Sequence, residues 1–237
     1  MDQAEFDKFA EEYKSLHREN IACTGEDPEY FAEYKMKDLK KIVKAASSAM
    51  QTGYFLDFGA GIGASIPFFR KYFPNAHLTC ADVSESCLKI ASTNSGNLAE
   101  YVTFDGICLP FVDNSFDVVY ASCVFHHIPP NEHVQLLREL WRVMKPNALI
   151  MLYEHNPFNI LTVRAVNSCP FDENAILISA SDMRVNFKLA GFLFTSVSYR
   201  VFFPRFLSFI RGMERFLRWL PLGAQYYIVA IKKDPAQ

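Results

Sequence analysis

The residues best suited to chemistry are an acid and two glycines at the end of an apolar stretch. Asp57 is followed by Gly59 and Gly61, with one residue between the glycines. Glycines this closely spaced let a backbone pass near a ligand, because no Cβ intervenes. A helical pattern follows over 64–72, so its first N–H groups would face the crevice where strand ends of open α/β sheets bind small molecules. The pattern predicts a bound nucleotide-like cofactor.

Two cofactors compete for this glycine loop. Gly59, Gly61 and Ala64 fit the spacing of the dinucleotide fingerprint, and Asp82 follows at a distance where an acid would bind ribose hydroxyls. Asp57, however, lies at the rim of the loop, where a carboxylate repels a pyrophosphate and attracts a cationic amino group. S-adenosylmethionine has an ammonium, a sulfonium and no phosphate. The charge argument therefore favours S-adenosylmethionine over NAD, and an NAD-dependent oxidoreductase is the alternative.

Several further motifs follow in order between 54 and 153. Asp82 is the last residue of Leu-Thr-Cys-Ala-Asp, and Asp105 precedes a Leu-Pro-Phe turn. Three further motifs are Asp-Asn-Ser-Phe-Asp-Val-Val at 113–119, Phe-His-His-Ile at 125–128 and Leu-Trp-Arg-Val-Met-Lys-Pro at 140–146. At these spacings the chain resembles the class I S-adenosylmethionine-dependent methyltransferases. One departure is Asn147-Ala148, where that family often has two glycines. Asparagine also tolerates φ > 0, so the turn can be retained.

The resemblance implies an α/β fold of the Rossmann-like, three-layer α/β/α kind, with a mostly parallel seven-stranded sheet whose last strand is antiparallel. It also implies methyl transfer to oxygen or nitrogen of a small-molecule, lipid-linked or glycan-linked acceptor, with S-adenosylhomocysteine as product. A catalytically silent cofactor-binding partner protein is a further alternative. The residues expected to bind the cofactor are Asp57, Gly59, Ala60, Gly61, Asp82, Val83, Asp105, Gly106, Ala121 and Ser122.

Each of these residues has an expected role. Asp57 would contact the methionine end of the cofactor, and Asp82 would accept both ribose hydroxyls, since a carboxylate has two oxygens. Asp105 would accept a hydrogen bond from the adenine amino group, and Val83 would pack on the adenine ring. Ser122, after the fourth strand, could hold the methionine amino end.

Histidines supply the candidate general bases, because a side chain with a pKa of about 6.5 can take a proton at neutral pH. His126 follows the fourth expected strand and His155 the fifth, so both would lie at the ligand edge of the sheet. We expect one of them to deprotonate a hydroxyl or to orient the acceptor. The alternative is a hydrogen-bonded loop histidine. The adjacent pair His126 and His127 has no third ligand nearby in sequence, so no metal is expected. His133 is expected on the surface, without a role.

Short apolar segments alternate with helical patterns, which predicts βαβ units. We expect an N-terminal helical cap over 1–50 and a cofactor-binding domain over 51–237. Strands are expected at 54–58, 77–82, 101–104, 116–121, 148–154, 192–203 and 225–231. Helices are expected at 63–73, 84–93, 132–144 and 181–190, and a turn-rich loop at 156–174.

The segment 204–222 reads as one amphipathic helix inserted between the last two strands. Its apolar positions recur on one side, and four arginines against one acid give it a local charge of 4 − 1 = +3. Such a helix can pack on the sheet or on a second subunit. It can equally form an apolar and basic wall of the acceptor pocket or contact a membrane surface.

Composition limits the remaining possibilities. The chain has 237 residues and a net charge of −2, which gives no sign of a broad nucleic-acid surface. No secretory signal is visible at the N-terminus, and no run approaches the ~20 apolar residues that span a bilayer. Six scattered cysteines without a C-x-x-C pair suit a reducing compartment. We therefore expect a cytoplasmic protein, and the sequence leaves its oligomeric state open.

Overall fold

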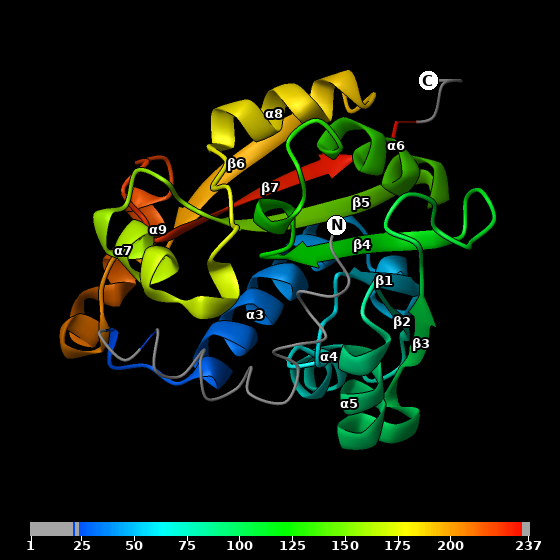
Figure 1. The fold of residues 1–237 in the computed structure, drawn as a ribbon, viewed down its shortest axis with the longest axis horizontal. Helices are drawn as coiled ribbons and strands as arrows, with labels where there is room; N and C mark the ends of the chain where they lie inside the picture. The colour runs from blue at the N-terminus through cyan, green and yellow to red at the C-terminus, as the bar shows by residue number, and fades with distance from the viewer. Residues whose placement is uncertain (1–20, 22–23, 234–237) are drawn as a thin grey trace.

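A computed structural model gives the fold, and it describes residues 21 and 24–233 (Figure 1). The first 20 residues of the helical cap expected over 1–50 lie outside this part of the chain. Among the described residues, no helix combines the length and the apolar character that crossing a membrane requires.

Seven strands form one sheet in the order β3-β2-β1-β4-β5-β7-β6. The neighbours from β3 to β5 pair in parallel, whereas β7 runs antiparallel to both β5 and β6. This confirms the predicted sheet with its antiparallel last strand. The strands are β1 (Tyr54–Phe58), β2 (His77–Asp82), β3 (Glu100–Thr103), β4 (Phe116–Ser122), β5 (Met144–His155), β6 (Thr195–Arg200) and β7 (Gln225–Ile231).

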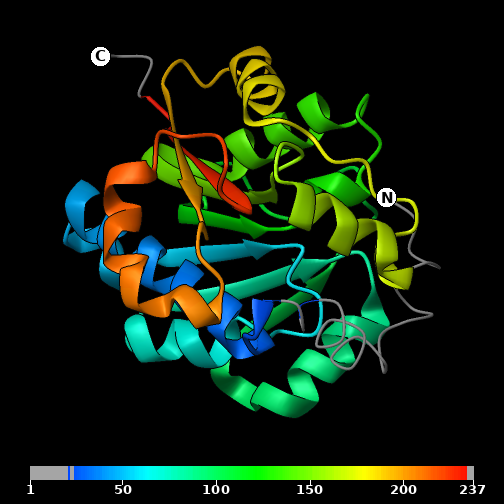
Figure 2. The same cartoon turned by 90° about the vertical axis from the view of Figure 1, so that its left-hand side faces the viewer.

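Helices cover both faces of the sheet, as Figures 1 and 2 show, with α3, α4 and α5 on one side and α6 and α8 on the other. The α-helices are α3 (Pro28–Ala46), α4 (Ile66–Tyr72), α5 (Glu85–Ser95), α6 (His133–Val143), α7 (Ile160–Ser168), α8 (Ala180–Leu189) and α9 (Glu214–Leu217). Short 3-10 turns are η2 (Ala49–Thr52), η3 (Gly96–Leu98), η4 (Phe125–His127), η5 (Pro170–Asp172) and η6 (Arg205–Met213).

The core is split by the sheet because successive side chains of a strand point to opposite faces. Phe55, Val118 and Met151 pack towards α3 and α4. Leu56 and Ile150 pack towards α6 and α8. Strands buried on both faces read as continuous apolar runs, which is why the central strands were predictable from sequence.

The turn after Pro146 keeps its expected form. Asn147 adopts a φ of 64°, in the left-handed region that asparagine tolerates better than most residues. The strand therefore runs through this position, and β5 begins at Met144 instead of at 148.

The single helix predicted over 204–222 is wrong. The segment forms η6 followed by the one-turn α9, with a non-helical Leu207 (φ −103°, ψ 20°) inside η6. Two features oppose a continuous α-helix. Gly212 has a low helix propensity. In addition, the Glu214 carboxylate accepts the N–H groups of Phe202 (3.1 Å) and Phe203 (3.3 Å), which folds the segment back on the end of β6.

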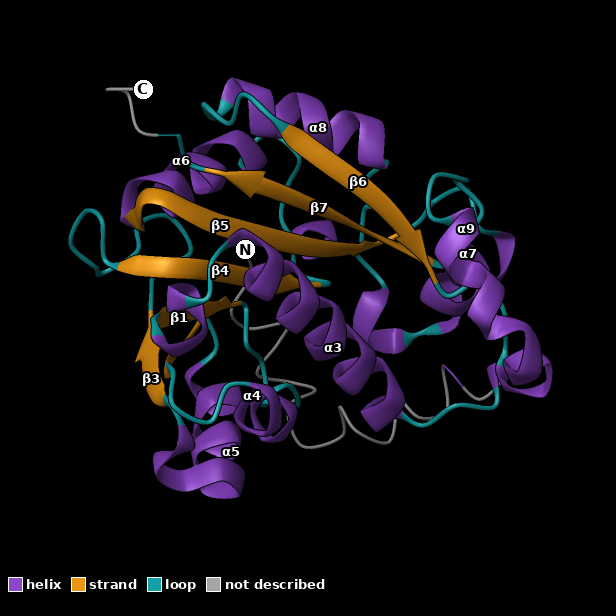
Figure 3. Cartoon of the chain, turned by 180° about the vertical axis from the view of Figure 1, so that it is seen from behind, coloured by secondary structure: helices purple, strands orange, loops and turns teal. Residues whose placement is uncertain are grey.

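The turn-rich loop predicted over 156–174 is also wrong in its centre, where α7 forms. The side chain of Asn159 accepts the N–H of Thr162 at 3.0 Å and so caps the first turn. Asn159 also donates to the carbonyl of Leu222 at 2.8 Å, which ties α7 to the segment before β7. Figure 3, seen from behind, shows β7 lying between β5 and β6 in the sheet.

Candidate active site

A cavity of about 300 Å³ lies at the carboxyl ends of β1, β2, β4 and β5. Its wall combines the glycine loop after β1 with parts of α3, η4, α7 and η5, and with the segment after β6. Parallel strands bring their ends to one edge of a sheet, so residues far apart in sequence meet there. Of the expected site residues, Asp57, Gly59, Ala60, Gly61, Asp82, Ser122, His126 and His155 line this cavity.

The glycine loop is held by the acid after β2. The N–H of Gly61 donates to Asp82 Oδ2 at 2.7 Å, and Oδ1 of the same carboxylate accepts the N–H of Ser84 at 2.9 Å. Gly59 and Gly61 have φ values of 71° and 52°, which glycine adopts without strain. A Cβ on Gly59 would come within 2.4 Å of Val124, whereas one on Gly61 would project into open space. The loop therefore leaves room for a ligand directly above its backbone.

Asp57 lies at the inner end of the cavity and is buried. Burial raises its pKa to about 6, because the charged form loses hydration, and the negative Asp82 adds to this increase. The hydroxyl of Ser65, which donates to Asp57 Oδ2 at 2.6 Å, and the ammonium of Lys35 act in the opposite direction. Because these two groups do not fully offset the effect of burial, a cationic ligand would further stabilise the ionised Asp57.

Lys35 is a site residue that the motif reading missed. It comes from α3, is buried, and donates from Nζ to Ser122 Oγ at 2.7 Å and to Cys123 Sγ at 3.3 Å. Within the described part of the chain no carboxylate pairs directly with this ammonium, although charges in a low dielectric are normally paired. The cavity thus places a cation, Lys35, close enough to Asp57 to lower the pKa of that carboxyl.

Cys123, at the end of β4, is electrostatically unusual. Burial raises the pKa of its thiol, but Lys35 and His155 outweigh that effect and bring the pKa to about 6. Cys123 has a φ of 57°, and Val201, which also lines the cavity, has a φ of 61°. Left-handed backbone at non-glycine residues, and above all at a β-branched valine, stores strain that is typical of functional sites.

A buried carboxylate organises the histidine end of the cavity. Glu154 Oε1 accepts the N–H groups of Val124 (3.0 Å) and Phe125 (2.7 Å), while Oε2 lies 2.6 Å from His126 Nδ1. Burial alone lowers the pKa of His126, but the charge of Glu154 and the neighbouring Asp172 outweigh it and raise the pKa to about 10. His126 is therefore a cation at neutral pH. His155 lies beside it, with ring centroids 5.0 Å apart.

Two further groups join this end. His127, whose pKa burial and the neighbouring charge of His126 lower to about 3, lies with its Nε2 3.4 Å from Asp172 Oδ1. Asp172 comes from η5, and sequence reasoning missed it because only the tertiary fold brings it to η4. His127 and Asp172 both line the cavity.

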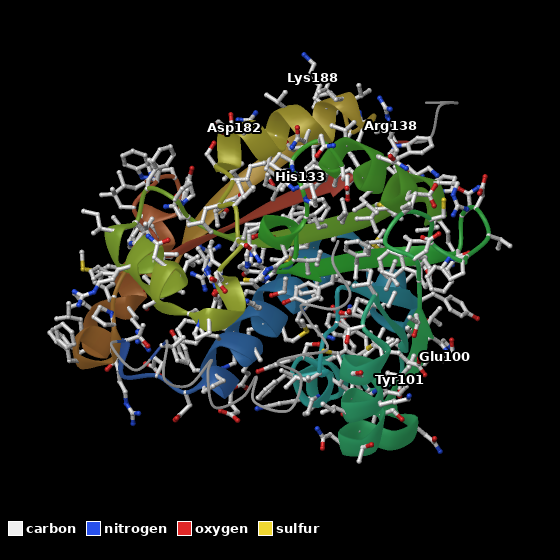
Figure 4. All side chains as sticks on the ribbon, viewed as in Figure 1. Glu100, Tyr101, His133, Arg138, Asp182 and Lys188 are labelled. Carbon is white, nitrogen blue, oxygen red and sulfur yellow. The ribbon has the colours of Figure 1, made fainter. Side chains whose placement is uncertain are left out.

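The surface position predicted for His133 is wrong. Its side chain, labelled in Figure 4, is fully buried, and Nε2 lies 2.9 Å from the carbonyl oxygens of both Phe125 and Ile128. His133 thus fixes the two ends of the turn that presents His126 and His127. It is a positioning residue that touches no ligand space.

Four expected cofactor residues lie outside the cavity wall. Val83 and Ala121 are buried behind it, and Gly106 is buried in the loop after β3. Asp105 is exposed, and its Oδ1 accepts the N–H groups of Ile107 (2.8 Å) and Cys108 (2.7 Å). These backbone donors lower the pKa of Asp105. The adenine role of these residues stays a prediction.

Comparison with known proteins agrees with this geometry. Residues 56–152 match the family model described as a methyltransferase domain. Over these residues, which are fewer than half of the chain, the protein matches the class I S-adenosylmethionine-dependent methyltransferases that its motifs resemble. Their cofactor is S-adenosylmethionine, so the NAD alternative is set aside.

Two curated relatives are methyltransferases of quinone biosynthesis. A demethylmenaquinone methyltransferase of Listeria welshimeri is 32% identical over 100 residues, which are 40% of this chain and 42% of that protein. A ubiquinone/menaquinone biosynthesis C-methyltransferase of Pseudomonas putida is 30% identical over 124 residues, covering 49% and 47%. The chain thus spans less than half the length of these relatives.

A solved structure extends the likeness of fold to nearly the whole chain. It is an S-adenosylmethionine-dependent methyltransferase of Thermotoga maritima, described as a possible histamine N-methyltransferase, with a TM-score of 0.66 and 18% identity over 98% of this chain and 99% of that one. At this identity only the fold is shared, and the acceptor must be inferred from the cavity.

The residues of this methyltransferase domain fit the cofactor. The amino-acid part of S-adenosylmethionine carries one positive and one negative group, and the cavity presents a buried Asp57 and a buried Lys35. The open space above Gly61 is where a side chain at this position would otherwise stand. No pyrophosphate-binding cluster of cations accompanies the loop among the described lining residues.

Proposed function

We propose that the chain transfers the methyl group of S-adenosylmethionine to a hydroxylated ring acceptor, of phenol or quinol type, that carries an apolar tail. The observation that supports this most directly is the composition of one continuous cavity. Asp57 and Gly61 suit the cofactor, and the same cavity is also lined by histidines and by apolar side chains such as Phe31, Leu161 and Phe202.

The cofactor would be bound by both charges of the inner end. Asp57 attracts its ammonium and Lys35 its carboxylate, while Asp82 accepts the ribose hydroxyls. Ser122 on the cavity wall would border the amino-acid part, with the buried Ala121 next to it in the chain. Val83, Asp105 and Gly106 remain the expected adenine side. When bound, S-adenosylmethionine supplies a methyl group that its sulfonium already activates, so the protein needs no covalent intermediate.

The remaining task of the chain is to position the acceptor and to exclude water. Methyl transfer is an in-line displacement, so its rate depends on the alignment of the attacking atom. His126, a cation held by Glu154, suits the role of orienting an acceptor oxygen better than that of a base. His155 lies beside it on the cavity wall and is the candidate base that removes the hydroxyl proton.

A ring hydroxyl allows methyl transfer to oxygen, which the resemblance predicts, and to carbon, which the name of one relative includes. Loss of its proton makes the oxygen and the neighbouring ring carbons nucleophilic. The resemblance alone predicts oxygen or nitrogen as the methyl-accepting atom, and the name of the Pseudomonas putida relative adds carbon. An apolar tail would suit the aromatic and aliphatic wall, which a small polar amine would leave unfilled.

Calorimetric titration with S-adenosylhomocysteine, and in parallel with NAD, tests the cofactor. We expect saturable binding of S-adenosylhomocysteine alone, weakened in Asp82→Ala. Formation of S-adenosylhomocysteine is then measured with a prenylated naphthoquinol, a simple phenol and a primary amine, and mass spectrometry locates the methyl group. Turnover of the quinol or phenol is expected. Turnover of the amine alone would contradict the acceptor class but not the cofactor.

A second observation supports delivery of the acceptor from a lipid surface. Phe206, Phe209 and Trp219 are 75%, 81% and 74% exposed, and they share the segment 204–222 with four arginines. Exposed aromatic side chains beside cations suit the interface of an anionic membrane. The same segment contributes Pro204 and Arg211 to the cavity wall, so the proposed contact surface adjoins the acceptor end.

Co-sedimentation with liposomes tests this contact. We expect binding to vesicles that contain anionic phosphatidylglycerol, and loss of binding in the triple variant Phe206→Ser, Phe209→Ser, Trp219→Ser. The matched control is Leu193→Ser with Phe194→Ser, because these side chains are also exposed but precede β6 at its other end. Equal binding of both variants would refute the role of this segment.

A further inference from the structure

Three metal-ligating side chains meet on the cavity wall although they come from two separate turns. His126 and His127 are adjacent in η4, and Asp172 lies in η5. No two of their donor atoms are more than 4.8 Å apart. Sequence reasoning expected no metal because the third group is remote along the chain, and the fold supplies that group.

The distances within this cluster suit coordination better than hydrogen bonding. His126 Nε2 lies 3.6 Å and His127 Nε2 lies 3.4 Å from the same oxygen, Asp172 Oδ1. N–H···O hydrogen bonds are about 2.7–3.2 Å long. Ligand bonds of about 2.0–2.1 Å to a tetrahedral ion, by contrast, separate the ligand atoms by about 3.3 Å. Two of the three donor–donor separations are thus near the edge of such a tetrahedron, and the two imidazoles need only approach each other slightly to share one ion.

Glu154 gives His126 the support that a metal-binding histidine requires. Metal-bound histidines usually direct their second ring nitrogen to a carboxylate or carbonyl, which fixes the ring and the tautomer. His126 Nδ1 lies 2.6 Å from Glu154 Oε2, and this carboxylate is itself held by two backbone N–H groups. Nε2 of His126 is consequently directed towards Asp172 and the cavity. A metal ion bound there would take the place of the Nε2 proton, so binding would release one proton from the cationic His126.

We propose that His126, His127 and Asp172 bind a divalent first-row transition-metal ion. Two imidazoles and one carboxylate suit zinc, iron(II), cobalt(II) or manganese(II), and they suit magnesium or calcium poorly. Three protein ligands leave at least one coordination position open. Since all three side chains line the cavity, that position faces the acceptor end.

The inference deepens the proposed function, on which its chemical meaning rests. An open position beside the acceptor would bind the oxygen of a phenol or quinol. A cation there lowers the pKa of a bound hydroxyl and favours the oxyanion. His155, 5.0 Å from His126 between ring centroids, is the nearby group that would receive the proton. This arrangement would also select hydroxylated acceptors over amines that are protonated in water.

Cobalt(II) titration of the full chain, carrying no histidine tag, tests the site. We expect one Co²⁺ per chain, with a visible absorption band of a low-symmetry nitrogen and oxygen site. His127→Ala and Asp172→Ala should each weaken the binding at least ~10-fold, because each removes one of three ligands. His77→Ala is the matched control, since this histidine is exposed and stacks only on Tyr54.

Two measurements keep the outcomes separate. Cys108→Ser is used as background, because the exposed Cys108 thiol could also bind cobalt. S-adenosylhomocysteine binding is titrated in every variant, and its retention shows that the cofactor end is folded. Absence of stoichiometric Co²⁺ and Zn²⁺ binding while S-adenosylhomocysteine still binds would overturn the metal site and leave the proposed function intact. Unchanged cobalt binding in both ligand variants would overturn it as well.

Discussion

Lys35 donates from Nζ to Ser122 Oγ at 2.7 Å, which joins the helix before the sheet to the end of β4. The contact brings a buried cation into the cavity end that also holds Asp57. α3 therefore does two things: it covers one face of the sheet, and its first half completes the binding site. The expected cap over 1–50 is, for its described part, integrated with the domain that it was predicted to cover.

Replacing Lys35 tests its role in binding the cofactor. We expect Lys35→Met to weaken S-adenosylhomocysteine binding about 10–100-fold, because hydrogen bonds to charged groups contribute about 1.5–3 kcal/mol. Lys37→Met is the control, since this lysine is on the same helix with a half-exposed side chain that pairs with Glu33. Calorimetry gives both affinities. Equal affinities would remove Lys35 from the cofactor site.

Cys123 is expected to react as a thiolate near neutral pH. With a pKa of about 6, set by Lys35 and His155 against the effect of burial, most of its thiol is ionised at pH 7. Iodoacetamide should therefore modify Cys123, and S-adenosylhomocysteine should slow the modification because both occupy the same cavity. Mass spectrometry of a Cys108→Ser background follows the reaction. Modification that is indifferent to ligand would mean that the cofactor lies elsewhere.

The sheet and the cofactor end could be predicted because their signals are local. β1, β2 and β7 have the predicted bounds, since each is a short apolar segment with turn residues at its ends. Asp57, Gly61 and Asp82 follow directly from strand ends, so their meeting required only the parallel topology. Motif and geometry therefore agree at this end of the cavity.

The acceptor end was less predictable because it depends on tertiary packing. Lys35 stands four residues after Phe31 and four before Leu39, on the apolar side of α3, and a lysine at such a position was the available signal. Asp172 carries no comparable signal, since its partners are set by how η5 folds against η4. α7 was missed because the segment is turn-rich, although Asn159 is a good N-cap.

His133 offers a test of how the histidine turn is positioned. We expect His133→Ala to lower the free energy of unfolding by about 2–4 kcal/mol, because two buried carbonyls lose their donor and a cavity is left. Gln135→Ala, at an exposed position of the same helix, is the control. Thermal unfolding gives the stabilities. A purely structural residue should leave S-adenosylhomocysteine affinity unchanged at low temperature, whereas turnover should fall as η4 shifts.

The raised pKa of Asp57 predicts a pH dependence of cofactor binding with a definite sign. The cationic end of the cofactor prefers the ionised carboxylate, so affinity is complete above a pH of about 6 and falls as the group becomes protonated. The dissociation constant of S-adenosylhomocysteine should rise roughly 10-fold per pH unit below that pKa. Calorimetry at several pH values measures it. In Asp57→Asn the affinity should be low and lack this pH step.

The raised pKa of Asp57 also predicts that the stability of the ligand-free protein changes with pH in the opposite direction to cofactor binding. Its folded-state pKa of about 6 exceeds the ordinary value of 3.8, so the folded protein binds the proton more tightly than the unfolded chain. Stability without ligand therefore decreases as pH rises from about 4 to 6, and ionised Asp57 destabilises the neutral-pH fold by up to about 3 kcal/mol. Asp57→Asn should raise the Tm at pH 7.5 while binding S-adenosylhomocysteine weakly. Ser65→Ala, which removes the hydroxyl donor and keeps the charge, should lower the Tm. A lower Tm in Asp57→Asn would mean that protein groups already stabilise the ionised carboxylate in the folded state without the cofactor.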